Sequence, residues 1–122
     1  NKKVLITAGP TYEAIDPVRF IGNHSSGKMG FEMAKTAASL GAKVFLITGP
    51  SSQIVSNNLI ERIDVVSAEE MFIEVHKYYE NSDIAICSAA VADYKPKMVS
   101  DSKIKKDTDI CLINSYGKTR NT

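Results

Sequence analysis

The feature that most limits how this chain can fold is a strand-like run followed by a glycine-rich loop and then an amphipathic helix. The run covers residues 3–8, and the loop covers residues 21–30. The N–H groups in the first turn of a helix lack partners within the helix, and the helix dipole favours negative charge there. This order of elements therefore predicts a place that can hold a phosphate.

Further strands are marked by short apolar runs bounded by glycine, proline or serine. Continuous runs predict strands buried in a parallel sheet, and an alternating run predicts a strand near the sheet edge. Buried strands are expected at 4–8, 42–48 and 83–88, an edge strand at 59–66 and one more strand at 110–113. The polar residues 114–122 are expected to fray.

Apolar residues at helical spacing predict helices at 27–40 and 68–80. The apolar stripe expected to face the sheet from the first helix consists of Met29, Met33, Ala37 and Leu40. A neighbouring stripe of small residues, which would allow close approach to the sheet, consists of Gly30, Ala34 and Ala38. The second helix opens with Ser67 and Glu70, which have the spacing of a capping box. Its expected buried residues are Met71, Phe72, Val75 and Tyr79.

The connection between the first strand and the first helix, residues 11–26, is much longer than the roughly 2–6 residues usual for such loops. A long connection is either functional or disordered. Its apolar residues favour an ordered loop packed on the domain, and they are Ile15, Val18, Phe20 and Ile21.

Strands that alternate with helices predict an α/β fold, a Rossmann-like three-layer domain with a mostly parallel central sheet. We expect one nucleotide-binding domain over residues 1–122. The carboxyl ends of the first and fourth strands should flank the topological switch point, where such sheets bind ligands. The turns within residues 9–30 and 88–94 are thereby expected to meet around one crevice.

Composition limits the other classes of function. The net charge of +1 argues against nucleic-acid binding through bulk charge, and no apolar run approaches the roughly 20 residues of a membrane span. Cys87 and Cys111 lack metal-ligand spacing, so a reduced, cytoplasmic setting is expected. Cys87 lies in an apolar run and is interpreted as a small buried hydrophobic residue.

Two familiar nucleotide motifs match incompletely. Residues 22–28 have the G-x-x-x-x-G-K spacing of a P-loop, but Met29 stands where a metal-binding serine or threonine belongs. The second strand is followed by Gly49 and Pro50, where an NAD enzyme usually has an acidic residue for the ribose. Both observations argue against these classes, and an NAD(P)-dependent oxidoreductase is kept as an alternative.

Individual polar residues allow two interpretations each. The Asn23 carboxamide could donate to an acyl oxygen, or it could be a turn residue. Asp93 could accept a hydrogen bond from a base or a ribose, or it could end a strand. The lysines of the segment 103–106 could bind phosphates, or they could be a solvated charge run.

Five stretches taken together resemble phosphopantothenoylcysteine synthetase. They are ITAGPT at 6–11, DPVR at 16–19, NHSSGKMG at 23–30, AAVADY at 89–94 and KIKK at 103–106. The resemblance covers about residues 3–106, and five motifs in order are far more specific than one glycine loop. Residues 113–122 do not match the family, so the chain is expected to lack the family's C-terminal portion. A non-catalytic oligomerisation fragment is therefore kept as a second alternative.

The resemblance implies a ligase of coenzyme A biosynthesis that joins 4′-phosphopantothenate to L-cysteine. The family uses CTP in its bacterial type, with Mg²⁺, and forms an acyl-cytidylate intermediate; these residues do not exclude ATP. It also implies a homodimer and possible fusion to, or association with, a flavin-dependent decarboxylase. Neither a nucleic acid nor a membrane is expected as a partner.

The resemblance also implies roles for single residues. Asn23 would steady the acyl-nucleotidylate, and Lys103 would bind the triphosphate and aid nucleotide transfer. The residues expected to line the nucleotide pocket are Gly9, Ser88, Ala89 and Asp93. The residues expected to hold phosphate or substrate are Arg19, Ser25, Gly27 and Lys28. No metal ligand is assigned.

Overall fold

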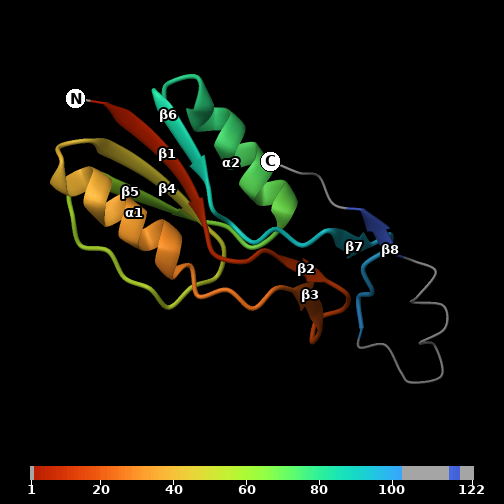
Figure 1. The fold of residues 1–122 in the computed structure, drawn as a ribbon. Helices are drawn as coiled ribbons and strands as arrows, with labels where there is room; N and C mark the ends of the chain where they lie inside the picture. Colours follow the sequence, from red (N-terminus) through yellow and green to blue (C-terminus); the bar gives the residue numbers. More distant parts are fainter. Residues whose placement is uncertain (1, 103–115, 119–122) are drawn as a thin grey trace.

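The computed structural model describes residues 2–102 and 116–118 (Figure 1). Its central sheet contains four parallel strands in the order β5-β4-β1-β6. These strands are β1 (Lys3–Ala8), β4 (Lys43–Thr48), β5 (Ile60–Asp64) and β6 (Ile84–Cys87). Helices α1 (Lys28–Ser39) and α2 (Ala68–Tyr79) lie on opposite faces of the sheet. The predicted α/β fold with a mostly parallel sheet is confirmed.

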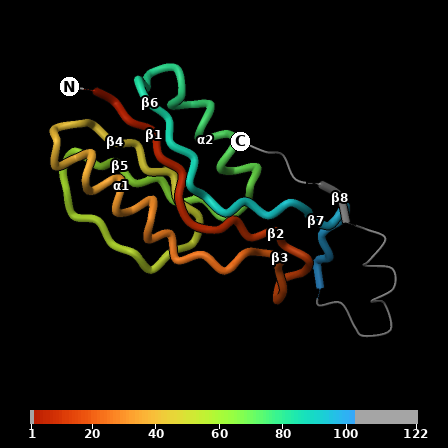
Figure 2. Tube along the Cα trace, in the orientation of Figure 1, coloured from red at the N-terminus to blue at the C-terminus, as the bar shows by residue number. Residues whose placement is uncertain are grey.

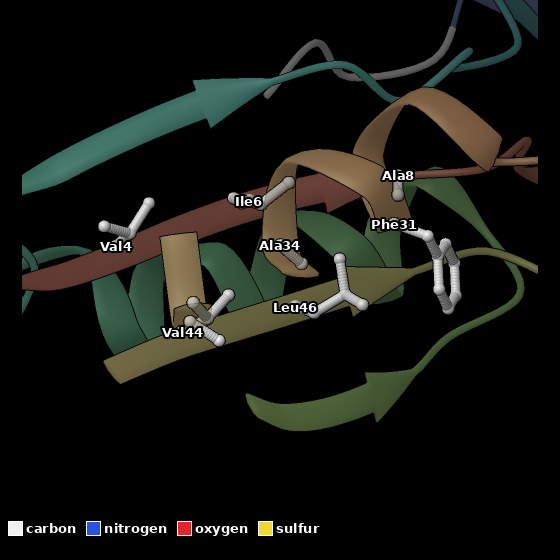
Figure 3. Packing of buried hydrophobic residues seen from close by; sticks show 8 residues of the cluster. Val4, Ile6, Ala8, Phe31, Ala34, Val44 and Leu46 are labelled. Atoms are coloured by element: carbon white, nitrogen blue, oxygen red, sulfur yellow. The ribbon is translucent and has the colours of Figure 1, made fainter. Parts of the chain in front are cut away.

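Strand β1 shows why the sheet needs two layers of helix. Its side chains alternate, so that Val4 and Ile6 join the core under α1 while Leu5 joins the core under α2. Figure 3 shows the α1 side, where Phe31 and Ala34 pack over the β-strand residues. Both faces of β1 are thereby buried, as the continuous apolar run predicts.

The buried face of α1 differs from the predicted one. Met29 and Leu40 are 71% and 83% exposed, whereas Phe31 and Ala34 are fully buried. The small residues Gly30, Ala34 and Ala38 face the sheet, as the prediction of a close approach requires. Because the small residues occupy the centre of the interface with the sheet, the larger residues Met29 and Leu40 lie outside it. On α2, Tyr79 is likewise 60% exposed, and Tyr78 packs on Phe45 in its place.

The long connection after β1 contains a β-hairpin that the sequence analysis did not predict. Strands β2 (Tyr12–Ala14) and β3 (Phe20–Gly22) pair in antiparallel fashion. The Asp16 carboxylate builds the turn, because it accepts hydrogen bonds from the Val18 and Arg19 N–H groups at 2.8 Å. The segment is ordered as predicted, but Val18 and Phe20 are more than half exposed rather than anchored in the core.

The C-terminal part of the described chain adds a second small sheet. Strands β7 (Tyr94–Pro96) and β8 (Tyr116–Lys118) pair in antiparallel fashion, and β7 lies beside β2 at one end of the molecule (Figure 2). The expectation that residues 116–118 fray is therefore wrong. The strand predicted at 110–113 lies outside the described residues.

Strand β6 is the edge of the central sheet within the described residues, where it pairs only with β1. This position explains why Cys87 is exposed rather than buried, which corrects the prediction. Apolar grooves run along both faces of this edge strand. One of about 270 Å³ lies between β6 and α2, lined by Leu5, Val75, Tyr79 and Ile86, and another lies between β6 and α1.

Candidate functional site

Polar groups converge at the carboxyl ends of β1, β4 and β6. The segments involved are the turn after β1, the loop after β4, residues 88–93 after β6 and the loop before α1. The apolar grooves along β6 lie elsewhere and follow from its edge position. A further groove of about 340 Å³, lined by Glu13, Ser67 and Lys95 among others, lies between β2, α2 and β7. We therefore place the candidate site at the strand ends, where donors and acceptors meet.

The segment after β6 continues the pairing of β6 with β1. Ser88 N–H donates to the Thr7 carbonyl at 3.1 Å, and Ala90 N–H donates to the Gly9 carbonyl at 2.8 Å. Thr11 N–H then donates back to the Ala90 carbonyl at 3.2 Å. Residues 88–90 are consequently held in register with 7–11 beyond the ends of the regular strands.

Side-chain hydroxyls complete this attachment. The Ser88 hydroxyl donates to the Thr7 carbonyl at 2.6 Å, and the fully buried Thr11 hydroxyl accepts from Ala92 N–H at 2.9 Å. These bonds fix the backbone that leads into Asp93, whose side chain is exposed. The sequence analysis assigned Thr11 no role of its own, and a hydroxyl three residues after a buried strand was the available signal.

Asn23 connects this segment to the glycine-rich loop. Its Nδ2 atom donates to the carbonyls of Ala90 and Val91, at 3.3 and 3.4 Å. The turns around 23–30 and 88–94 therefore meet, as the switch-point prediction required. Asn23 is exposed, so its carboxamide is also accessible to a ligand.

The N-terminus of α1 is open to an anion. Gly27 is its N-cap, with a left-handed φ of 80° and no side chain to cap the helix, and the first turn begins with Lys28, whose N–H donates to the Ser26 hydroxyl at 3.2 Å. The N-terminus of α2, by contrast, is already saturated by carboxylates. Glu70 closes its capping box, and the buried Glu13 accepts from Ala68 N–H at 2.9 Å. Of these two helices in the described chain, α1 is thus the one whose N-terminus has no carboxylate against it and can hold a phosphate.

Glycines allow the backbone segments to approach closely. A Cβ on Gly30 would lie 2.4 Å from the Ala8 Cβ and 2.7 Å from the Ser88 Oγ. A Cβ on Gly49 would lie 1.5 Å from the Pro10 carbonyl oxygen, so no residue with a side chain fits at this position. Gly9 also has a positive φ of 74° and lies next to Gly27. These contacts form a cradle of backbone around the first turn of α1.

The other predicted site residues have different surroundings. Arg19 lies in the hairpin turn, where its guanidinium binds the buried Asp16 carboxylate through Nε and Nη2 at 3.0 and 2.8 Å. Its predicted contact with a substrate phosphate stays a prediction. Ser25 is half-buried, and Lys28 is exposed beside the N-cap. Lys103 lies outside the described residues.

Hydrogen bonds shift two pKa values on α2. The Ser67 N–H donates to the Glu70 carboxylate and holds its pKa below the usual value of 4.5. The hydrogen bond from Tyr78 to Glu61 raises the pKa of the Tyr78 hydroxyl. Within residues 2–102 and 116–118, no three histidine, cysteine or acidic side chains are grouped to hold a metal ion. None of the helices in this same part of the chain is long and apolar enough to cross a membrane.

Comparisons with known proteins agree on one family. Residues 1–116 match the DNA/pantothenate metabolism flavoprotein C-terminal domain. The chain is 56% identical over 109 residues to the coenzyme A biosynthesis bifunctional protein CoaBC of Vibrio cholerae, covering 89% of this chain and 27% of the relative. It is 49% identical over 114 residues to a cysteine/cysteine sulfinic acid decarboxylase from an unknown prokaryotic organism, covering 93% and 32%.

A solved structure agrees as well. The crystal structure of the C-terminal domain of CoaBC superposes with a TM-score of 0.76 at 45% identity, covering 86% of this chain and 55% of that chain. The chain thus spans 27% to 32% of the length of the two curated relatives described above.

Proposed function

The chain belongs to the DNA/pantothenate metabolism flavoprotein C-terminal domain family, the phosphopantothenoylcysteine synthetase domain, and we propose that it acts in coenzyme A biosynthesis as a phosphopantothenate–cysteine ligase. In this proposal it joins 4′-phosphopantothenate to L-cysteine at the expense of CTP. The observation that supports it best is the bond from Asn23 to the Ala90 carbonyl, which joins the loop that leads into α1 to the segment after β6. That junction offers backbone donors for phosphate beside a carboxamide for an acyl group.

The proposed reaction has two steps. The carboxylate of 4′-phosphopantothenate attacks the α-phosphorus of CTP, an acyl-cytidylate forms and pyrophosphate leaves. The cysteine amine then attacks the acyl carbon, CMP leaves, and the amine releases a proton as the amide forms. Both steps place negative charge on phosphate oxygens, so fixed donors that meet this charge lower the barrier.

The chain's own groups divide these tasks. The N–H groups of the first turn of α1, with the exposed Lys28 beside them, bind phosphate oxygens. The Asn23 carboxamide donates to the acyl oxygen of the intermediate. The segment 88–93 lines the nucleotide pocket, and its firm attachment to β1 lets it hold the nucleotide in one position. Lys103 is proposed to bind the triphosphate.

Mg²⁺ is proposed as the metal cofactor, and when bound it neutralises charge on the nucleotide phosphates. Such ions are commonly held by substrate phosphates and water, with few protein ligands. The glycine cradle fits a nucleotide phosphate, because it brings backbone donors close without side chains in between. The chain is further proposed to form a homodimer and to be fused to, or associated with, a flavin-dependent decarboxylase, since its relatives are named as a bifunctional protein and a decarboxylase.

Calorimetry with Mg²⁺ tests the proposal. CTP is titrated into the chain with and without 4′-phosphopantothenate, and ATP and NAD(P) are titrated in parallel. We expect CTP to bind and to stabilise the fold, by about 2.7 kcal/mol at a hundredfold excess over its dissociation constant. Equal stabilisation by NAD(P), or a nicotinamide-dependent absorbance change, would favour the oxidoreductase instead, and no binding would favour a non-catalytic fragment.

Activity measurements test the two proposed catalytic residues. Asn23→Asp should slow turnover of the acyl-cytidylate, and Lys103→Gln should slow its formation or decay. Pyrophosphate release and product formation are measured separately, so that the two steps are distinguished. Normal rates of both in the two variants would reject these assignments.

A further inference from the structure

The connection between β4 and β5 is unusual for neighbouring parallel strands. Such strands are normally joined by a crossover helix, but residues 51–57 contain none. The loop nevertheless packs on the α1 face of the sheet, where Val55 contacts the core. Something other than a helix must therefore hold this loop in place.

Arg62 on β5 supplies the attachment. Its Nη1 donates to the Gln53 carbonyl at 2.7 Å, and its Nη2 donates to the Ser51 carbonyl at 3.3 Å. Its Nε donates to Asp64 at 3.1 Å. The planar fork of a guanidinium allows these three directions at once, which an ammonium group cannot reproduce.

The same guanidinium contacts α1. Its central carbon lies 5.0 Å from the centroid of the Phe31 ring, within the range of a cation–π interaction. Phe31 is fully buried and belongs to the first turn of α1, where its N–H donates to the Gly27 carbonyl at 3.0 Å. Arg62 thus contacts both the loop after β4 and the helix end of the candidate site.

Ser51 links the loop to the glycine turn. Its hydroxyl donates to the Ser26 carbonyl at 2.5 Å and accepts from Gln53 N–H at 3.1 Å. The Ser26 carbonyl and the Gly27 N–H belong to one planar trans peptide, so fixing the direction of the carbonyl also fixes the direction of that N–H. A Cβ on Gly27 would lie 3.2 Å from the Ser51 hydroxyl, so the two segments are in close contact.

We propose that Arg62 is a positioning residue for the phosphate-binding turn at the start of α1, and that it acts through Ser51. The identity of the ligand rests on the proposed function, whereas the positioning does not. Arg62 holds the carbonyls of residues 51 and 53, which sets the Ser51 hydroxyl against the Ser26 carbonyl. The N–H groups around Gly27 are thereby oriented before a phosphate arrives.

The test compares Arg62→Lys, Ser51→Ala and the double variant of the full chain. Arg62→Lys keeps the charge and removes the fork, so general electrostatics are preserved. Asp64→Asn is the matched control, because it weakens the Arg62 contact that does not lead to the loop. Inorganic pyrophosphate and CTP with Mg²⁺ are the ligands, and calorimetry gives their affinities.

We expect Arg62→Lys and Ser51→Ala each to weaken pyrophosphate binding about tenfold, the effect of losing one good hydrogen bond. The double variant should bind no more weakly than Arg62→Lys, because both changes break the same path. Asp64→Asn should bind like the unsubstituted chain. Effects of the two single changes that simply add would refute action through Ser51.

Amide hydrogen exchange without ligand gives a second readout. The amides of Lys28 and Phe31, which donate to the Ser26 hydroxyl and the Gly27 carbonyl, should exchange faster in Arg62→Lys and Ser51→Ala, while amides of α2 keep their rates. Equal acceleration in α2 would mean a general loss of stability and would refute the inference, as would unchanged exchange and binding. If the unsubstituted chain binds neither pyrophosphate nor CTP, the proposed function fails, and the exchange rates still decide the positioning.

Discussion

Replacing Gly30 with alanine tests whether close contact between α1 and β1 sets the position of the phosphate-binding turn. The added Cβ would lie 2.4 Å from the Ala8 Cβ and 3.2 Å from the Ala8 Cα. Carbon atoms in ordinary contact are about 3.5–4.0 Å apart, so the first turn must move by roughly 1 Å. The new methyl group cannot shift toward Ser88 either, because it would lie 2.7 Å from the Ser88 hydroxyl, which already donates to the Thr7 carbonyl.

The expected loss of stability follows from two opposing effects. Overpacking a close contact costs about 1–3 kcal/mol, and replacing glycine by alanine within a helix returns about 1 kcal/mol. The net loss is therefore about 1 kcal/mol, or a few degrees in melting temperature. Binding should suffer as well, because the N–H groups that face the phosphate move with the first turn, and losing one good hydrogen bond costs about tenfold. We expect pyrophosphate affinity to fall at least about tenfold.

Gly41→Ala at the other end of α1 is the control. Gly41 has a φ of 91°, and a Cβ there would meet nothing within 4 Å, so this change adds backbone strain without a clash. Both variants should melt at lower temperatures by thermal denaturation, and only Gly30→Ala should bind pyrophosphate more weakly in calorimetry. A Gly30→Ala variant that is more stable than the parent, or that binds equally well, contradicts the reasoning.

Three further predictions concern the surroundings of the site. The pKa of Glu70 is lowered in the folded state, so its carboxylate stabilises the fold above the usual value of 4.5 and loses this effect as the pH falls through the folded pKa. In Glu70→Gln, the free energy of unfolding in urea should therefore depend less on pH in the acid range. Thr11→Val should lower the free energy of unfolding by about 1–3 kcal/mol, because the hydroxyl that accepts from Ala92 N–H is removed. Thr11→Ser keeps a hydroxyl and should retain most of the stability in the same urea assay. Asn23→Asp places a carboxylate against the carbonyls of Ala90 and Val91, so CTP affinity should fall in calorimetry; unchanged affinity would show that this contact is dispensable.

The sequence predicted the layered fold because its two central strands, β1 and β4, are buried on both faces. A run such as residues 4–8 has to bury every side chain, and a parallel sheet between two helical layers does so. The breakers Gly9 and Gly49 then marked the strand ends, where close backbone contacts require glycine. Because parallel strands end at the same edge, the meeting of the turns around Asn23 and Ala90 was predictable too.

Other features depend on contacts that local pattern does not encode. Met29 and Leu40 fit a helical stripe as well as the buried residues do, and the preference for Gly30 and Ala34 follows from the short distance between α1 and β1. Cys87 is exposed because its strand forms the sheet edge in the described chain, which an apolar run of four residues cannot reveal.

The sequence predicted where the polar residues of the site lie. It did not predict the residues that hold them in place, Thr11 and Arg62. Asn23 was recognised through a motif that lies in one stretch of sequence. Thr11 bonds a backbone N–H 81 positions later, and Arg62 bonds loop carbonyls 9 and 11 positions earlier. Such pairings become visible only when the strand order and register are known.

In the part of the chain that the structure describes, β6 has an open edge, which has a practical consequence for work with this chain. Natural edge strands are usually guarded by lysine, proline or a bulge against pairing with another molecule. Strand β6 reads Ile-Ala-Ile-Cys, has no charge and exposes Ile84 by 49%. Within residues 2–102 and 116–118 no strand pairs with the outer side of β6, so its N–H and C=O groups there form a template to which a strand of a second molecule can add, and binding assays belong at high dilution.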